Sequence, residues 1–228
     1  MTADPSLLAL LQLADSGLPT GSYAFSNGLE GAYHLGLFDS PAALDEFLRC
    51  ALEAVVCGEI PFVQSCFLLE DADWQQVGDI LACYEAILTA PSVLHASLVT
   101  GKNWLRLLEG MYGQVGLAAL RQRLLADGLP LHFTVVFALS LKRVGFALEQ
   151  VKRLLLFQSL RDQVSAAVRL GLVGPLEAAR RLRHLSDYGE VLLARLGARS
   201  YRQAYRAAPQ LDIAQAMHGY LYSRLFQS

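Results

Sequence analysis

The sequence predicts an all-α protein, a single-domain helical bundle of about nine or ten helices over residues 1–228. Proline, glycine and capping residues recur at helix-length intervals, and the segments between them carry apolar residues at helical spacing. Alternating β-branched residues are nearly absent, and residues 133–137 are the only short strand candidate. No linker is long enough to divide the 228 residues into two domains.

The first two helix starts each show a capping residue followed by proline. Asp4 precedes Pro5, and Ser40 precedes Pro41. A side-chain oxygen can cap the helix at the first position, and proline fits the next because no backbone N–H is needed there. The first helix is therefore expected to begin at Pro5 and to end near Asp15.

The helix after Ser40 is expected over residues 41–57, with Gly58 as its end. Its apolar stripe, typical of a core helix, consists of Leu44, Phe47, Leu48, Ala51, Leu52 and Val55. Glycine and proline divide the following sequence into further helices, expected over residues 61–70, 74–88, 92–109, 115–127 and 131–144.

The longest pattern covers residues 146–170, and its low charge predicts a central helix. The residues at helical spacing in it are Leu148, Val151, Leu154, Leu155, Gln158, Asp162, Ser165 and Val168. A helix over residues 176–196, ended by Gly197, is expected next. Pro209 then precedes a last helical or extended segment, residues 211–228.

Composition indicates partners that are proteins. With 54% hydrophobic and 18% charged residues, the chain has more apolar surface than a monomer usually exposes. A net charge of -2 gives no reason to expect nucleic acid or anionic lipid. The longest uncharged stretch, residues 86–101, is too short to span a membrane, and residues 1–13 lack the basic start of a secretory signal. We therefore expect a cytoplasmic protein with no membrane partner.

The metal-binding residue types are scattered. Four cysteines without a CxxC pair are expected as reduced core thiols, with a metal site or disulfide as alternatives: Cys50, Cys57, Cys66 and Cys83. Five histidines each stand without a second His or Cys at helical spacing: His34, His95, His132, His184 and His218. No stable metal site is therefore expected.

Sequence signatures of catalysis are also missing. The chain contains no GxxxxGK[ST] phosphate loop, serine-hydrolase elbow or kinase signature. We expect a protein that is not an enzyme, with no catalytic residues and no stably bound cofactor. An arginine-rich stretch is interleaved with Glu177, Asp187 and Glu190, which favours a solvated face over an anion-binding surface; its arginines are Arg180, Arg181, Arg183, Arg195, Arg199, Arg202 and Arg206.

An unusual run of turn-forming residues, 18–30, follows the first helix. Asn27 is expected to cap the next helix, with the Glu30 side chain reaching back to the Asn27 N–H in a capping box. Tyr23 and Phe25 then have fixed directions, and spacing alone favours a connection whose aromatic side chains fill the core.

This N-terminal signature resembles that of UreF, a family of urease accessory proteins. In that family a leucine-rich helix leads to Leu-Pro, a Gly, a Ser-rich turn with an aromatic residue, and Gly-Leu-Glu. The matching residues here are Leu18, Pro19, Gly21, Ser22, Tyr23, Ser26, Gly28, Leu29 and Glu30.

A second match lies at the other end of the chain. Residues 211–213, His218 and residues 221–228 (LYSRLFQS) resemble the family's closing His and Ser-Arg-Leu-Phe-x-Ser. Between the two ends, matches recur in family order, so the resemblance covers essentially the whole chain: Ala96, Ser97, Gly101, His132, residues 165–170 and Gly174.

Three positions in the middle of the chain depart from the family pattern. Leu94 stands where an Arg is common before the Ala-Ser pair, and Leu172 and Pro175 replace the Pro and Gln usual around Gly174. These departures put in doubt any contact that the family makes through that Arg or Gln, and they leave both terminal signatures intact.

The resemblance implies an all-helical homodimer that bridges the scaffold protein UreD (also called UreH) and the GTPase UreG in the complex that loads nickel into apo-urease. Nickel and GTP are then handled by the partner complex. The expected partner-binding residues lie in the two signatures: Pro19, Gly21, Ser22, Tyr23, Ser26, Gly28 and Glu30, with His218, Tyr222, Arg224, Leu225, Phe226 and Ser228.

The C-terminal tail, residues 221–228, is assigned to the UreD contact, because Tyr, Arg and Phe dominate binding energy at interfaces. We expect it to be mobile alone and to fold on docking; packing of residues 211–220 on the protein's own core is the alternative. The N-terminal signature is assigned to UreG or to the dimer partner.

Two rival functions remain. A GTPase-activating regulator of UreG would need one exposed Arg to enter the nucleotide site. A small-ligand-binding helical bundle unrelated to urease would also explain the apolar content.

Overall fold

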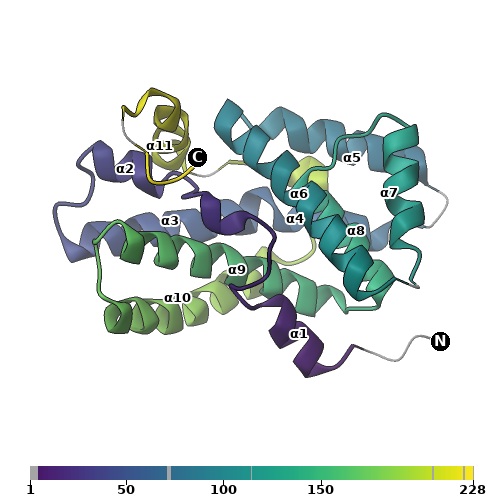
Figure 1. Cartoon of the computed structure of the whole chain (residues 1–228), viewed down its shortest axis with the longest axis horizontal. Helices are drawn as coiled ribbons and strands as arrows, with labels where there is room; N and C mark the ends of the chain where they lie inside the picture. The colour runs from purple at the N-terminus through teal and green to yellow at the C-terminus, as the bar shows by residue number, and fades with distance from the viewer. Residues whose placement is uncertain (1–4, 71–72, 114, 207, 223, 228) are drawn as a thin grey trace.

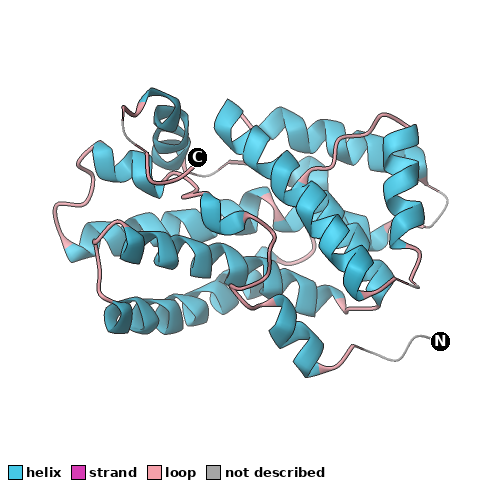
Figure 2. Cartoon of the chain, viewed as in Figure 1, coloured by secondary structure: helices cyan, strands magenta, loops and turns pink. Residues whose placement is uncertain are grey.

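A computed structural model describes residues 5–70, 73–113, 115–206, 208–222 and 224–227. These residues form helices and loops with no strand, so the expected all-α class is confirmed (Figures 1 and 2). They contain eleven α-helices. Only Glu59 separates α3 from α4, and counting this pair as one helix gives ten, as expected.

The helices from α3 to α10 begin and end within two residues of their expected bounds. In chain order, the α-helices are α1 (Leu7–Leu13), α2 (Leu29–His34), α3 (Pro41–Gly58), α4 (Ile60–Leu68), α5 (Trp74–Ile87), α6 (Pro91–Met111), α7 (Leu117–Ala126), α8 (Phe133–Val144), α9 (Leu148–Arg169), α10 (Pro175–Leu196) and α11 (Pro209–Met217). Three short 3-10 helices accompany them: η1 (Ser22–Ala24), η2 (Tyr201–Gln203) and η3 (His218–Tyr220). The strand candidate at residues 133–137 is part of α8.

Both ends of α3 are as expected. Ser40 Oγ accepts a hydrogen bond from the Ala43 N–H at 3.2 Å, and Pro41 is the first helical residue. All six residues of the expected apolar stripe are buried. α3 ends at Gly58, and the chain continues into α4 after the single residue Glu59. Buried apolar residues on both sides of Glu59 hold α4 in the core.

The combined helix α3–α4, Pro41–Leu68, is long and apolar enough to cross a membrane, and among the residues described it alone meets that test. However, 67% of its most apolar window is buried inside the protein. The core helix of a soluble protein meets the same test.

The first helix begins later than expected. Asp4 lies outside the described residues, and Pro5 precedes the helix. Ser6 is the capping residue, since its Oγ accepts a hydrogen bond from the Ala9 N–H at 3.2 Å. Ser6 has extended backbone and a side-chain oxygen of its own, so it competes successfully with the Asp4–Pro5 start.

As expected, α9 is central. It packs against α1, α2, α3, α4, α8 and α10. Figure 1 shows α9, α10 and α3 running side by side at one end, whereas α4 to α8 form the other. Trp104, Phe62 and Phe137 are fully buried there. The two halves are joined through α3–α4 and α9, and α2 and α11 pack together at the edge (Figure 1).

The arginine-rich stretch is only partly a solvated face. Arg180 and Arg183 are exposed and pair with neighbouring carboxylates of α10. Arg181 is buried, with Nε 2.7 Å from Asp45 and Nη1 2.6 Å from Glu177. The expectation is therefore wrong for Arg181: a buried guanidinium needs charged partners, and it finds them on α3 and on its own helix.

The four cysteines are free thiols. Cys66 is buried, and the other three are half-buried. Burial raises the pKa of the Cys66 thiol to about 12, so this thiol is protonated and inert at neutral pH.

Candidate functional site

The N-terminal signature, residues 18–30, turns sharply between α1 and α2. Gly21 has φ 83°, a left-handed conformation that glycine adopts without strain, and η1 follows it. Tyr23 is 57% exposed, whereas Phe25 is 3% exposed and lies in the core. The interpretation that both aromatic side chains fill the core is therefore wrong for Tyr23, because η1 turns the two rings in different directions.

The start of α2 differs from the expected capping box. Asn27 and Gly28 both have positive φ, 52° and 94°, so neither has the extended backbone of a capping residue. The Glu30 N–H donates to Ser26 Oγ at 3.3 Å. The Glu30 side chain points away from Asn27, because it binds donors near the C-terminus instead. The expected Asn27–Glu30 box is thus wrong.

Helices α2 and α11 approach so closely that only glycine fits between them. A Cβ placed on Gly31 would lie 2.0 Å from the carbonyl oxygen of Ala214. A Cβ on Gly28 would lie 2.9 Å from Cγ of Gln215, whose amide donates to the Asn27 carbonyl at 3.4 Å. These contacts bring the N-terminal signature against the C-terminal part of the chain.

The Glu30 carboxylate is the centre of this contact. Its Oε2 lies 3.1 Å from His218 Nε2, and it accepts backbone hydrogen bonds from Leu225 (2.5 Å to Oε1) and Phe226 (3.3 Å to Oε2). Glu30 and His218 are each 1% exposed. An ionised carboxylate only accepts hydrogen bonds, so His218 Nε2 carries the proton in this arrangement.

Arg169, the last residue of α9, provides a second contact between the N-terminal and C-terminal signatures. Its guanidinium carbon lies 3.7 Å from the ring centre of Tyr23 and 4.0 Å from that of Phe226. Its Nη1 donates to the Tyr23 carbonyl at 2.7 Å. Burial lowers the pKa of Arg169, although the guanidinium stays charged at neutral pH. The cation is thus held between two aromatic faces.

The structure sorts the expected partner-binding residues by exposure. The exposed residues are Pro19, Tyr23, Tyr222, Arg224 and Leu225. Gly21 and Ser22 are half-buried. The buried residues are Ser26, Gly28, Glu30, His218 and Phe226. Ser228 lies outside the described residues. The exposed group is available to a partner in this conformation, whereas the buried group holds the two signatures together.

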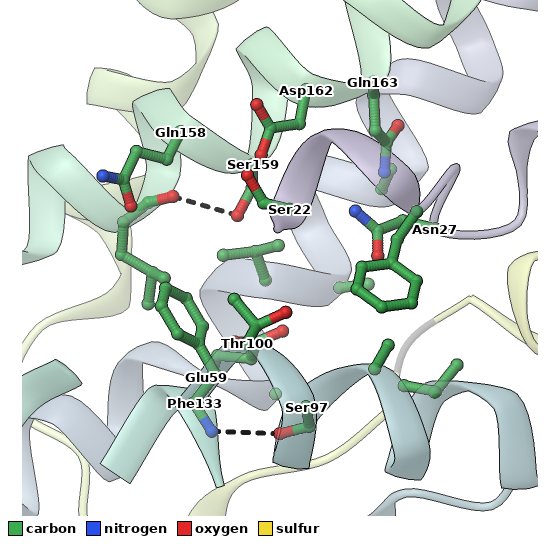
Figure 3. Close-up of a pocket in the computed structure, with 18 of the residues that line it drawn as sticks. Ser22, Asn27, Glu59, Ser97, Thr100, Phe133, Gln158, Ser159, Asp162 and Gln163 are labelled. Atoms are coloured by element: carbon green, nitrogen blue, oxygen red, sulfur yellow. Dashed lines mark hydrogen bonds between the residues drawn. The ribbon is translucent and has the colours of Figure 1, made fainter. Parts of the chain in front are cut away.

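A cavity of about 150 Å³ lies beneath the N-terminal signature. Figure 3 shows polar side chains from the signature, α6 and α9 around it, with Glu59 from the α3–α4 junction: Ser22, Asn27, Glu59, Ser97, Thr100, Gln158, Ser159, Asp162 and Gln163. Gln163 Oε1 is buried and has no hydrogen-bond partner among the described protein groups. A cavity of this size with these polar groups in its mixed wall has room for several ordered waters.

Glu59, between α3 and α4, lines the same cavity and has hydrogen-bond partners from other helices. Thr134 Oγ1 donates to Glu59 Oε2 at 2.5 Å and lies 2.9 Å from the Tyr84 hydroxyl. Burial raises the pKa of the Glu59 carboxyl, against the smaller effects of the Thr134 hydrogen bond and the Arg206 charge. Burial and the Glu59 charge likewise raise the pKa of Tyr84. These groups form a buried hydrogen-bonded chain.

The part of the chain that the structure describes contains no group of three or more His, Cys, Asp or Glu residues placed to hold a metal ion. His132 is buried beside Ser97, with 3.2 Å between Nδ1 and Oγ. Burial lowers the pKa of His132, and Glu85 opposes this effect. His218 binds Glu30, so these two histidines occupy separate environments.

Sequence reasoning missed two residues of this region. Arg169 lies in the matched segment 165–170, but no role was assigned to it. Glu59 is a single charge between apolar residues of α3 and α4, a signal that points to a buried carboxylate with specific partners. Neither residue could be paired with its contacts, which are distant in sequence.

Comparisons with known proteins agree on one family. Residues 38–186 match the model of the UreF family. Urease accessory protein F of Oryza sativa subsp. indica is 34% identical over 224 residues, 97% of this chain and 85% of that protein. Urease accessory protein F of Arabidopsis thaliana is 34% identical over 220 residues, 95% and 90% of the two chains. Urease accessory protein UreF of Paenarthrobacter aurescens is 28% identical over 224 residues, 97% of both.

Proposed function

The chain belongs to the UreF family of urease accessory proteins, and we propose that it acts in urease maturation as a non-catalytic bridge between the scaffold protein UreD (UreH) and the GTPase UreG. In this proposal nickel is the cargo delivered to apo-urease, and GTP binds to UreG. The protein works in the cytoplasm as a homodimer.

The observation that carries the proposal is the meeting of the two family signatures at one edge of the molecule. Tyr23, Tyr222 and Leu225 are all exposed beside buried anchors. Tyrosine and arginine are enriched among the residues that contribute most of the binding energy at protein interfaces. A surface of this kind suits docking rather than catalysis.

Exposed apolar residues extend this surface. On α2 and the residues after it, Tyr33, Leu35 and Leu37 are between 41% and 44% exposed, and on α11 Ile213 is 58% exposed. A stable interface buries roughly 1,200–2,000 Å² in total. We assign the C-terminal tail to UreD, and the exposed face of the N-terminal signature to UreG or to the second copy of the chain.

Co-expression with UreD and UreG, followed by size exclusion, tests the proposal. The three proteins should elute together with this chain present, and UreD and UreG should separate in its absence. Light scattering of the chain alone should give the mass of a dimer. Elution of UreD and UreG without this chain in their peak would contradict the bridge.

The same preparation distinguishes a GTPase-activating role. Single-turnover GTP hydrolysis by UreG, measured with and without the chain, should not accelerate if the chain only bridges. Acceleration that a single exposed arginine variant abolishes would favour the regulator instead.

A further inference from the structure

The C-terminal tail is held by a buried acid and a buried imidazole rather than by its own secondary structure. After η3 the described residues 221–222 and 224–227 form no further helix, and Leu221, Tyr222 and Leu225 are not buried. The backbone N–H groups of Leu225 and Phe226 instead donate to the Glu30 carboxylate. The Gln227 N–H donates to the Ala24 carbonyl at 2.7 Å.

The buried Glu30 carboxylate needs the backbone donors of the tail, just as the position of the tail needs the carboxylate. The side chain is 1% exposed, so water cannot replace donors that leave while the site stays closed. Removing the tail would leave Oε1 without the Leu225 N–H and Oε2 with His218 as its remaining donor described here. An under-satisfied buried carboxylate is costly, so the closed tail is strongly favoured over a partly detached one.

We call the hydrogen bonds that join the Glu30 carboxylate to His218 and to the backbone of Leu225 and Phe226 the clasp. The clasp also decides which tail residues face outward. Phe226 is buried against Arg169 and fixed at its N–H by Glu30, so the neighbouring Leu225 side chain points away and is 60% exposed. Tyr222, earlier in the tail, is fully exposed. A detached tail would present these side chains in many orientations, and a partner would have to order them on binding.

The contact between α2 and α11 does not depend on the clasp. It rests on the close approach of Gly31 to Ala214 and on buried Leu29, Leu211 and Ala214. Loss of the Glu30 carboxylate should therefore release the tail while leaving α11 in place. Release of the tail with α11 still in place would show that Glu30 positions the tail and is not needed for the packing of α11.

We propose that Glu30 and His218 are positioning residues for partner docking: together they fix the C-terminal tail in the orientation that presents Leu225 and Tyr222 to UreD. The inference rests on the proposed docking of the tail to UreD. The pair acts through the tail backbone and has no contact with the partner itself.

Glu30→Gln tests the acid, because the amide keeps one acceptor and turns a donor toward the tail or His218. We expect the tail amides to exchange hydrogen about tenfold faster or more, and UreD affinity to fall by a similar factor, with unchanged helicity. Glu46→Gln, at an exposed carboxylate of α3, is the matched control and should change neither quantity. Unchanged tail exchange in Glu30→Gln would overturn the proposal.

His218 variants test the imidazole without touching the acid. Gln can place its amide nitrogen near the position of His218 Nε2, whereas Leu cannot donate. His218→Gln should therefore keep tail protection and UreD affinity, and His218→Leu should lose both. Equal losses in the two variants would show that the residue matters only for packing and would contradict the positioning role.

A double variant separates this inference from the proposed function. In a chain that lacks residues 221–228, Glu30→Gln should cause no further loss of UreD affinity, since its effect passes through the tail. A further loss would overturn the inference. Full UreD binding by the truncated chain alone would reject the docking assignment, and hydrogen exchange in the free protein would still decide whether the clasp holds the tail.

Discussion

Nε2 of His218 lies 3.1 Å from Oε2 of Glu30, although 188 positions separate the two residues in the sequence. Both side chains are almost completely buried. The pair joins the first turn of α2 to η3, and so connects the N-terminal signature to the C-terminal tail. The two terminal signatures are therefore parts of one surface.

Deleting residues 221–228 should leave a soluble helical protein that no longer retains UreD. The tail contributes one large buried side chain to the core, Phe226, among its described residues, so the remaining core stays intact. A pull-down with tagged UreD, together with circular dichroism of the truncated chain, measures both effects. Retained UreD binding would refute the assignment of the tail.

A single exposed leucine should reproduce part of that loss. Leu225→Ser is expected to weaken UreD binding, because an exposed apolar side chain that becomes buried at an interface contributes roughly 1.5–3 kcal/mol. Leu125→Ser is the matched control, since Leu125 is 54% exposed on α7, away from α2 and α11 (Figure 1). Titration calorimetry with UreD should separate the variants, and similar affinities would argue against tail docking.

Replacing Tyr23 tests the N-terminal signature. Tyr23→Ala removes one of the two rings that cover Arg169, a cation–π contact that contributes about 0.5–2 kcal/mol, so UreG recruitment or dimerisation should fall without a large loss of helicity. Tyr23→Phe keeps the ring and should bind nearly normally. Size exclusion with UreG and light scattering provide the measurement. Unfolding of Tyr23→Ala would instead indicate that the ring mainly supports the core.

Gly31 should tolerate no side chain. The Cβ of Gly31→Ala would lie 2.0 Å from a backbone oxygen, so α2 and α11 must separate. We expect a loss of about 3 kcal/mol or more and a fall in Tm of roughly 6–12 °C. Gly110→Ala is the control: the position is helical, and a Cβ there meets nothing within 4 Å. It should leave Tm unchanged or raise it, and equal effects would contradict the close contact.

Glu59 should make stability depend on pH. Burial raises its folded pKa above the ordinary value of 4.5, so the folded state keeps a proton that the unfolded state has lost. The free energy of unfolding therefore falls as pH rises from about 4.5 through the folded pKa. Glu59→Gln lacks this titration, so its stability relative to the unmodified protein should rise with pH over that window, as measured by urea denaturation.

A second variant checks the cause of the Glu59 effect. Thr134→Val removes the hydroxyl that donates to the carboxylate and opposes the rise of its pKa. The stability loss of this variant should therefore deepen with increasing pH. Curves parallel to that of the unmodified protein would show that the carboxylate does not titrate in this environment.

Local sequence signals identified the helices well, because each carries its own apolar stripe and its own ends. Ser40 and Pro41 marked the start of α3 correctly, and the apolar spacing of residues 146–170 identified the central helix α9. The signals failed where two local alternatives competed, as with Asp4 and Ser6 at the start of α1. They also failed where a distant partner decided the outcome, as with Glu30.

The candidate site was only half predictable. The family resemblance assigned the N-terminal signature to docking, and that assignment stays a prediction; the structure shows that Tyr23 and Leu225 are exposed. Sequence spacing could not reveal that Arg169 lies between Tyr23 and Phe226, or that Glu59 borders a cavity. Such contacts depend on how helices distant in the sequence pack against one another.

The sequence by itself determined the helical class, the bounds of α3 to α10 and the family, since these follow from local periodicity and from residue types in order. Only the tertiary structure decided that the N-terminal and C-terminal signatures meet, and which of their residues face solvent. It also decided that the Glu30 side chain binds His218 and the tail backbone instead of capping its own helix. The physical reason is that a buried carboxylate takes the donors that the packed fold places around it, and the packing of α11 on α2 placed them there.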